Sequence, residues 1–440
     1  MDKTISEILE FVEENDIKFI RLQFCDVFGE LKNISIMSSQ LEKAFLHGIS
    51  FDASSINGFL TIEDSDLFLV PDPSTLAILP WRPQEGRVAR FFCYIKTPSG
   101  EHFEGDCRYL LKKTVEELRI KDYTAKVGPE CEFYLFKTDD EAEPLLVPQD
   151  RAEYFDVAPF DKGENVRREI CLTLEEMGLK PESSHHESGP GQNEIDVKYD
   201  NPVESADNFI TLKSVVKTIA GLNGLYASFI PKPLFTQSGS GLHINLSLFK
   251  EDKNIFKINN GHSKKAESFI AGIMFRIKEI TAILNPIINS YKRFGSHEAP
   301  KYITWSHKNR SQLIRIPAST GEYSRMELRS ADGTCNPYLA FALLIKAGLE
   351  GVELERKLPN AFDGNAYNIN ESMQLDTLPA SLDEAIKFMK NSDFVKDTLG
   401  EFLFNKFIEK KEKECREYHE NSSRDDEISD WEINNYFYRF

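Results

Sequence analysis

The segment Val127-Gly128-Pro129-Glu130-Cys131-Glu132-Phe133-Tyr134-Leu135-Phe136 contains the strongest structural signal in the chain. Its aromatic and aliphatic content is typical of a β-strand, in which alternate side chains lie on the same face. Glu130 and Glu132 therefore share one face, and the apolar residues that alternate with them face a core. Neighbouring carboxylates repel each other, so we expect solvent, an arginine or a metal ion to offset the cost. On this segment alone, a solvated sheet face is the alternative interpretation.

The rest of the chain shows apolar periodicity on both sides of this strand. Apolar patterning predicts strands at residues 18–36 (paired around a turn at Gly29-Glu30), 88–96, 124–137, 194–200, 227–231, 242–249, 312–316 and 325–329. Residues 66–80 contain two short apolar runs broken by Pro71, Pro73 and Pro80. Helical spacing predicts helices at residues 4–15, 40–47, 108–120, 163–177, 205–223, 264–284, 336–350 and 381–420. The pattern predicts an α+β protein. A small, mostly β unit spans residues 1–105, and the strands of a larger unit, residues 106–440, can form one sheet.

Composition excludes several classes of partner. The 440 residues include 53 basic and 71 acidic side chains, a formal net charge of −18. Such a surface argues against coating duplex nucleic acid and against docking on an anionic membrane. Apolar runs are shorter than the roughly twenty residues that a membrane span needs, and the first residues do not resemble a signal peptide. The seven cysteines are scattered without a CxxC pair, which favours reduced thiols. We expect a cytoplasmic protein.

Two further stretches place polar groups beside glycine turns. His185-His186-Glu187-Ser188-Gly189-Pro190-Gly191-Gln192-Asn193-Glu194 sets two carboxylates around a tight loop, and Mg²⁺ and Mn²⁺ prefer carboxylate oxygens. In the strand at 242–249, His243, Asn245 and Ser247 share one face. The preceding turn, Ser238-Gly239-Ser240-Gly241, is expected to leave backbone N–H groups free for an anion. An ordinary polar loop and a structural histidine are the alternatives.

Arginines are concentrated at residues 289–329 of this acidic chain. Arg315 lies inside an apolar strand, where an unpaired charge is costly, and Arg325, Glu327 and Arg329 share one strand face. Guanidinium groups fit carboxylate and phosphate oxygens, and no Walker A sequence is present, so metals and arginines would have to hold any nucleotide. Carboxylates on several strands with this arginine cluster indicate metal-assisted phosphoryl transfer to a carboxylate substrate. An internal salt-bridge network is the alternative.

Taken together, the motifs resemble those of type I glutamine synthetases from bacteria and archaea. The resemblance covers nearly the whole chain, in the same order, at residues 51–55, 128–133, 185–194, 239–243, 289–293, 309–311, 314–317, 327–329 and 336–338. It implies an N-terminal β-grasp domain and a catalytic domain. In the catalytic domain, helices surround an antiparallel sheet that lines the active site.

The resemblance also implies an activity. Enzymes of this family make L-glutamine from L-glutamate and ammonia, with ATP as substrate and γ-glutamyl phosphate as intermediate. They use two or more Mg²⁺ or Mn²⁺ ions per site. They assemble as a dodecamer of two hexameric rings, with active sites between subunits. A nitrogen-regulatory protein is a further partner that the resemblance suggests.

Roles for individual side chains follow from the matched motifs. The ligands of the metal near glutamate and ammonia would be Glu132, Glu187 and Glu194. The ligands of the metal near ATP would be Glu130, His243 and Glu327. The glutamate site would comprise Gly239, Arg293 and Arg329, and the ATP site Tyr199, Asn245, Ser247, Arg310, Arg315 and Arg325. Ammonium would meet Asp52 of a neighbouring subunit, Ser55, Tyr154 and Glu187. The catalytic residues would be Asp52, Arg310 and Glu298, the last closing the site against water.

Two departures from the family pattern keep alternatives open. The segment Arg293-Phe294-Gly295-Ser296-His297-Glu298 is one residue shorter than the usual Arg-Leu-Val-Pro-Gly-Tyr-Glu, and Ser238 replaces a common asparagine. These changes motivate a γ-glutamyl ligase of the same superfamily that uses an amine in place of ammonia. A non-catalytic scaffold or nitrogen sensor is the alternative from another class, and the presence of every implied metal ligand counts against it.

Overall fold

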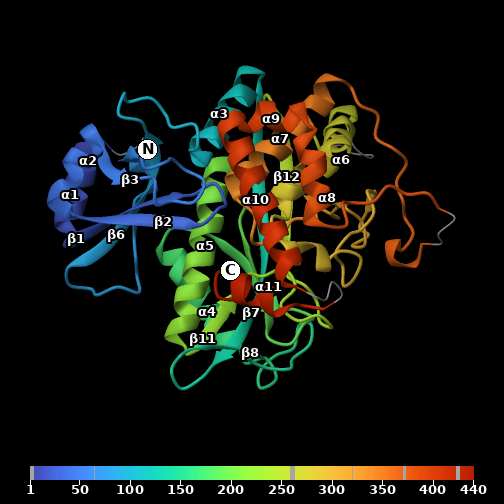
Figure 1. Ribbon diagram of the computed structural model, residues 1–440, viewed down its shortest axis with the longest axis horizontal. Coiled ribbons are helices and arrows are strands. Elements are labelled where there is room, and N and C mark those ends of the chain that lie inside the picture. Colours follow the sequence, from blue (N-terminus) through green and yellow to red (C-terminus); the bar gives the residue numbers. More distant parts are fainter. Residues whose placement is uncertain (1–3, 64, 258–262, 320, 370–372, 423–426) are drawn as a thin grey trace.

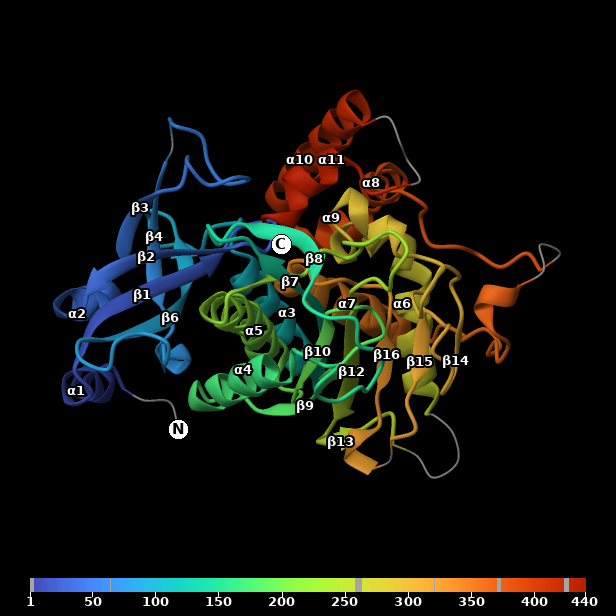
Figure 2. The same cartoon turned by 90° about the horizontal axis from the view of Figure 1, so that it is seen from below.

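The computed structural model describes residues 4–63, 65–257, 263–319, 321–369, 373–422 and 427–440. Within these ranges the chain forms an N-terminal unit on a six-stranded sheet and a larger unit on a ten-stranded sheet (Figures 1 and 2). The α+β class predicted from periodicity is confirmed. The proposed division into residues 1–105 and 106–440 stays a prediction.

The N-terminal unit folds around one strand with a parallel neighbour. Its elements are α1 (Ile5–Glu14), β1 (Ile17–Cys25), β2 (Leu31–Met37), α2 (Leu41–His47), β3 (Ile49–Asp52), β4 (Asp66–Pro71), β5 (Ala77–Ile78) and β6 (Arg87–Lys96). The strand order is β2-β1-β6-β4-β3, and β5 pairs with β6. β1 and β2 form the hairpin expected around Gly29, whose φ of +80° is left-handed backbone that favours glycine. β1 then pairs parallel with β6.

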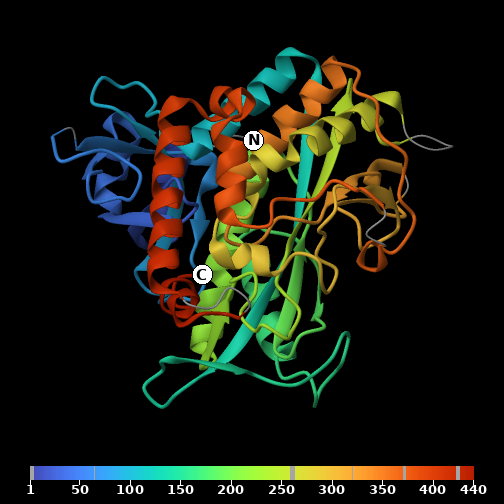
Figure 3. The same ribbon diagram turned by 45° about the vertical axis from the view of Figure 1, so that its right-hand side comes forward.

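The larger unit is built on a long central strand. Its strands are β7 (Tyr123–Thr138), β8 (Pro144–Pro148), β9 (Pro181–His186), β10 (Gln192–Val197), β11 (Leu225–Ser228), β12 (Leu242–Lys250), β13 (Lys253–Asn254), β14 (Trp305–His307), β15 (Ile314–Ile316) and β16 (Met326–Leu328). The main order is β14-β15-β16-β12-β7-β10-β9, and every pairing is antiparallel except β14 with β15. Figure 3 shows β7 and β12 as two long neighbouring strands in the middle of this unit.

Helices gather on one side of the large sheet, and a C-terminal group packs near them. They are α3 (Cys107–Ile120), α4 (Glu164–Glu176), α5 (Pro202–Leu222), α6 (Lys264–Leu284), α7 (Pro337–Glu353), α8 (Leu382–Lys390), α9 (Asp393–Leu399), α10 (Glu401–Asn421) and α11 (Asp430–Glu432). Helix α7 is almost entirely buried between its neighbours, as its apolar sequence predicts. None of the helices in the described ranges is long and apolar enough to cross a membrane.

One sequence-based expectation needs correction, and one strand that carries site residues was missed. The helix predicted at 381–420 is three helices, because Ser392 caps α9 and Gly400, with φ +79°, ends it before α10 begins. The strand β9 was not predicted, since Pro181–His186 is mostly polar and lacks apolar alternation. It forms because β10 offers a paired edge, which is a long-range contact that a local pattern does not encode.

Candidate active site

The cross-strand register of the large sheet brings acidic side chains together. β7 lies between β10 and β12, with Glu132 opposite Glu194 and with Glu130 opposite both Asp196 and His243. Directly opposed side chains on one sheet face have Cβ atoms about 5 Å apart. The register therefore makes a compact acidic site from residues distant in the sequence.

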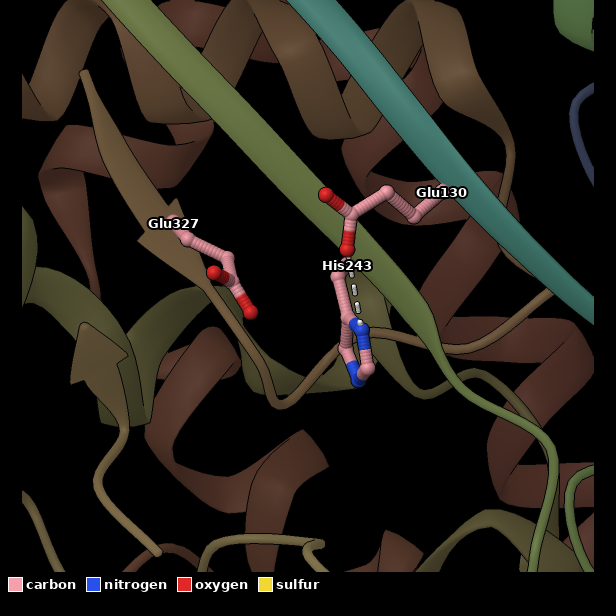
Figure 4. A group of neighbouring side chains, drawn as sticks. All are labelled: Glu130, His243 and Glu327. Atoms are coloured by element: carbon pink, nitrogen blue, oxygen red, sulfur yellow. Dashed lines mark ion pairs between the residues drawn. The ribbon is translucent and has the colours of Figure 1, made fainter. Parts of the chain in front are cut away.

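Three overlapping groups of donors result. In each group, one ligand atom per residue lies within 4.8 Å of the others: Glu130, His243 and Glu327; Glu132, Glu194 and His243; His185, Glu187 and Glu194. Figure 4 shows Glu130 on β7, His243 on β12 and Glu327 on β16 converging from three strands. The five glutamates and the one histidine that sequence analysis assigned to metal binding all lie in these groups. His185 lies there too.

Burial makes this cluster electrostatically unbalanced. Burial and, after it, the Glu132 carboxylate together raise the pKa of Glu187 to about 8. Burial and the carboxylates around Glu194, Asp196 first among them, hold its pKa well above the ordinary range. Burial lowers the pKa of His243 to about 3, and Arg329 acts in the same direction, so this imidazole is a neutral donor. Carboxylate oxygens and one neutral imidazole are donors that suit Mg²⁺ or Mn²⁺.

Glu132 is held in place by the turn that precedes β12. Its Oε2 accepts hydrogen bonds from the Gly241 N–H (2.8 Å) and from Gln192 Nε2 (3.2 Å). The expectation of free N–H groups at this turn is therefore wrong at these positions. The Gly241 N–H already binds an anion, which is the protein's own Glu132, and the Ser240 N–H donates to the carbonyl of Pro231.

A pocket of about 160 Å³ opens beside the first donor group. It is lined by four of the residues that the resemblance assigned to ATP, namely Tyr199, Asn245, Ser247 and Arg325. Asn245 donates to Glu130 Oε1 (2.9 Å) and accepts from Arg325 Nε (2.8 Å). The pocket and the donor group are thus joined by hydrogen bonds.

Arginines pair with two carboxylates at the donor groups. Glu327 is fully buried and forms ion pairs with Arg315 and Arg329. Arg329 also donates to Glu298 Oε2 (3.1 Å), and Arg310 Nη1 lies 3.8 Å from the same oxygen. Glu298 has a φ of +64°, left-handed backbone that costs energy for a residue with a side chain. Three arginines assigned to the site therefore converge on two carboxylates.

Arg293 is buried behind this cluster, against the glycine turn. Its guanidinium donates to the carbonyls of Ser330 (2.9 Å) and Arg329 (3.0 Å). A Cβ on Gly239 would lie 2.8 Å from Arg293 Cγ, and one on Gly241 would lie 2.4 Å from Nη2. The two glycines are needed because Arg293 passes so close to the backbone.

Three residues assigned to ammonium are placed differently. The ring of Tyr154 lies 5.6 Å from that of His185, and the Glu187 charge helps to raise its pKa, second to burial. Asp52 and Ser55 instead belong to the N-terminal unit, where Asp52 accepts from Ser54 and Ser55. In Figures 1 and 2, β3, which ends at Asp52, lies well apart from β12. Within one chain, these two residues do not meet the cluster.

Sequence reasoning missed three side chains of the site. His185 lies between Glu187 Oε1 (3.5 Å) and Glu194 Oε1 (3.4 Å), Gln192 binds Glu132, and Asp196 faces Glu130 across the sheet. Gln192, Glu194 and Asp196 alternate along β10, so the period-two rule applied to β7 would have found them on one face.

Comparison with known proteins identifies the family. Residues 16–98 match the model of the glutamine synthetase β-grasp domain, and residues 104–436 match that of the glutamine synthetase catalytic domain. The glutamine synthetase of Clostridium saccharobutylicum is 46% identical over 445 residues, which cover 99% of both chains. That of Methanosarcina mazei is 47% identical over 423 residues, covering 94% of this chain and 95% of its own.

Solved structures share this fold. A structure titled as a complex of GmaS with ADP superposes with a TM-score of 0.87 at 27% identity, covering 99% of this chain and all of its own. An apo GmaS structure gives the same TM-score at 28% identity. The expected β-grasp domain and catalytic domain are confirmed, and the chain is an enzyme of the glutamine synthetase family.

Proposed function

We propose that this protein forms L-glutamine from L-glutamate, ammonia and ATP, through γ-glutamyl phosphate and with two divalent metal ions. The observation that carries the proposal is the set of overlapping donor groups on β7, β10, β12 and β16, bordered by arginines. Phosphoryl transfer between a nucleotide and a carboxylate needs cations around the phosphate oxygens, and this arrangement supplies places for them.

The donor groups divide naturally between two metals. Glu130, His243 and Glu327, which form one donor group, would hold one metal. Glu132, Glu187 and Glu194, which come from the other two groups, both of which contain Glu194, would hold the other. The raised pKa values of Glu187 and Glu194 support this assignment, because buried like charges are stabilised when a cation arrives. Bound Mg²⁺ or Mn²⁺ would neutralise phosphate oxygens and orient the substrates.

The side chains of the protein would bind and orient the reactants. The pocket lined by Tyr199 and Ser247 is suited to the nucleotide, and the neighbouring structure that contains ADP supports this use. Arg310, Arg315 and Arg325 would stabilise charge on the transferred phosphoryl group. Arg293, Arg329 and the backbone at Gly239 would hold glutamate.

Ammonia would enter between subunits. Because Asp52 and Ser55 lie far from the cluster in a single chain, we propose that a neighbouring subunit supplies Asp52 to deprotonate ammonium beside Tyr154 and Glu187. A dodecamer of two hexameric rings in the cytoplasm would provide such interfaces. Glu298 would cover the acyl phosphate and exclude water, which would otherwise hydrolyse it.

Product analysis tests the proposal directly. Purified protein is incubated with glutamate, ATP, Mg²⁺ and ammonium, and glutamine, ADP and phosphate are quantified. Equal amounts of the three products are expected. Phosphate release without any amide product, at saturating ammonium, would contradict ammonia as the nucleophile.

A γ-glutamyl ligase that uses an amine is the second candidate, favoured by the short segment before Glu298 and by Ser238. Ser238 is buried, and its carbonyl accepts from Tyr134 (2.6 Å) beside the site. The same assay with a panel of primary amines separates the candidates. An amine with a kcat/KM well above that of ammonium would replace the leading proposal. Ring assembly and ATP binding without any product would indicate the scaffold.

A further inference from the structure

The C-terminal segment, residues 429–440, packs directly behind the arginine assigned to glutamate. Figure 1 shows the C-terminus folded back against the larger unit. The N–H of Phe229 donates to the carbonyl of Phe440 (2.8 Å), and Tyr226 donates to the carbonyl of Phe437 (2.5 Å). Tyr436 is buried with Ile230 and Ile287. The segment thus contacts both backbone stretches that lead into the site.

Glu432 is the charged centre of this packing. Its side chain is fully buried, at 0% exposure. One carboxylate oxygen accepts from Asn289 Nδ2 (3.0 Å), and the other accepts from Lys292 Nζ (2.6 Å) and from the Ser429 N–H (2.8 Å). A buried carboxylate is tolerated only with such partners, so its geometry is tightly determined.

Asn289 connects Glu432 to the glycine turn. Its Oδ1 accepts from the Lys232 N–H (2.7 Å), and its Nδ2 donates to the Lys232 carbonyl (3.0 Å) as well as to Glu432. The amide therefore joins two segments. One is the turn η3 (Ile288–Lys292), and the other runs from Lys232 to Gly239.

Arg293 follows η3 directly and contacts Gly239 at the far end of the second segment. The Arg293 side chain passes so close to Gly239 that a Cβ there would lie 2.8 Å from Arg293 Cγ, so the two are in direct packing contact. A displacement of Asn289 would therefore move the guanidinium and the backbone that, under the proposed function, bind glutamate together.

We propose that Glu432 is a positioning residue for the glutamate site. Through Asn289 and Lys292 it fixes the orientation of Arg293 relative to Gly239, although it touches neither substrate. This inference rests on the proposed function for its substrate and on the hydrogen bonds above for its geometry. Residues 429–440 would then contribute to the affinity of the site for glutamate.

Kinetics of Glu432→Gln test the proposal. The variant keeps the shape of the side chain but presents an amide N–H₂ to Lys292 or to Asn289, where an acceptor is required. We expect kcat/KM for glutamate to fall by about 10–100-fold, mainly through KM, because small misplacements of binding groups have effects of this size. The KM for ATP should stay unchanged.

Glu414→Gln is the matched control. Glu414 is also buried, and it accepts from Tyr436 (2.5 Å) and Lys411 (2.8 Å) in the same C-terminal packing, without a hydrogen bond to Asn289. It should lower thermal stability but leave the KM for glutamate unchanged. Equal rises in KM for glutamate in both variants would overturn the proposal, because a general loosening would then explain them.

Hydrogen exchange separates a failure of this inference from a failure of the proposed function. Amides of residues 228–241 and 287–293 should exchange faster in Glu432→Gln than in wild type or Glu414→Gln, whatever reaction the enzyme catalyses. Unchanged exchange in both peptides would overturn the positioning role. If wild type forms no glutamine but exchange changes as expected, the positioning role stands and the proposed substrate falls.

Discussion

Two buried groups of charges in this protein are balanced in opposite ways. Between the N-terminal unit and the helices, Arg108 Nη2 lies 2.8 Å from Asp207 and 2.9 Å from Asp72, and Tyr338 donates to Asp207 (2.7 Å). In the acidic site, Glu187 and Glu194 face other carboxylates and a neutral histidine. The first group has its counter-charge within the chain, whereas under the proposed function a bound cation would supply it for Glu187 and Glu194.

The difference separates structural from functional charge. A buried ion pair whose charges balance needs no bound ion. Breaking such a pair leaves an uncompensated buried charge. A buried cluster of like charges lowers the stability of the ligand-free protein. Such clusters occur at functional sites, where a bound cation offsets the repulsion. The comparison therefore predicts opposite responses to neutralising one carboxylate in each group.

The largest effect is expected for Asp207→Asn. The substitution leaves Arg108 buried with Asp72 alone, and breaking a buried pair of this kind costs about 3–5 kcal/mol. Denaturant unfolding at fixed protein concentration measures the loss, and the Mg²⁺ affinity should not change. Glu353→Gln, at the exposed Lys121–Glu353 pair, is the control and should stay within about 0.5 kcal/mol. A changed Mg²⁺ affinity in Asp207→Asn would contradict the proposal that the Arg108–Asp207 group is structural only.

Neutralising Glu194 should have the opposite sign in the metal-free protein. Glu194→Gln removes one of several repelling carboxylates, so the free protein should unfold at a higher temperature. Mg²⁺ binding, followed by calorimetry, should weaken by at least the 10–100-fold seen when a partner of a metal ligand is lost. If the metal-free variant is instead destabilised as Asp207→Asn is, the site charges are balanced internally and the metal assignment fails.

The sequence predicted the acidic site better than it predicted what supports it. Alternation along 127–136 placed Glu130 and Glu132 on one face, and the register with β10 and β12 brought their assigned partners opposite. Strand periodicity repeats every two residues, so the facing side chains follow once the strands are known. The resemblance supplied the roles, which no spacing rule contains.

Supporting contacts were not predictable because they join distant segments. Glu432 reaches Asn289 across 143 positions, and Gln192 reaches Glu132 across 60. Each of these hydrogen bonds depends on tertiary packing that local patterns do not encode. Asp52 is a different case, since within one chain it lies apart from Tyr154 and Glu187, and we propose that it meets these residues of a neighbouring subunit.

Neutralising Glu298 should have a smaller effect, confined to one step. Glu298 is half-exposed, and its carboxylate meets Arg329 and Arg310. Glu298→Gln weakens this closure, so amide formation should fall by about tenfold, less than the ~10²–10⁴-fold that a positioned acid or base contributes. ADP release with glutamate but no ammonium should persist, because water can then reach the acyl phosphate. Equal losses in both assays would remove Glu298 from the closing role.

Asp26 provides the smallest and most demanding test, because it is a buried carboxylate outside the site whose ion-pair partner, within the described residues, is a lysine. Its Oδ1 accepts from the N–H groups of Phe28 (2.9 Å) and Glu30 (3.0 Å), and Lys32 lies 3.7 Å from Oδ2. Burial raises its pKa from 3.8 to about 6, and Glu30 adds to the shift. Folded protein therefore holds the proton more tightly, and this contribution to stability is lost as pH rises from about 4 to about 6.

Asp26→Asn should remove this pH-dependent loss of stability, because an asparagine keeps the Oδ1 acceptor and carries no charge. The free energy of unfolding should depend less on pH between 4 and 6 than in wild type. Near pH 7 the variant should be the more stable, by less than the ~3 kcal/mol that two pKa units represent. Identical pH profiles would mean that two backbone N–H groups and a lysine already balance a buried carboxylate. The lack of an arginine partner would then not be enough to identify a buried carboxylate as functional. Only the repulsion between neighbouring carboxylates, which helps to raise the pKa values of Glu187 and Glu194, would still set these two apart.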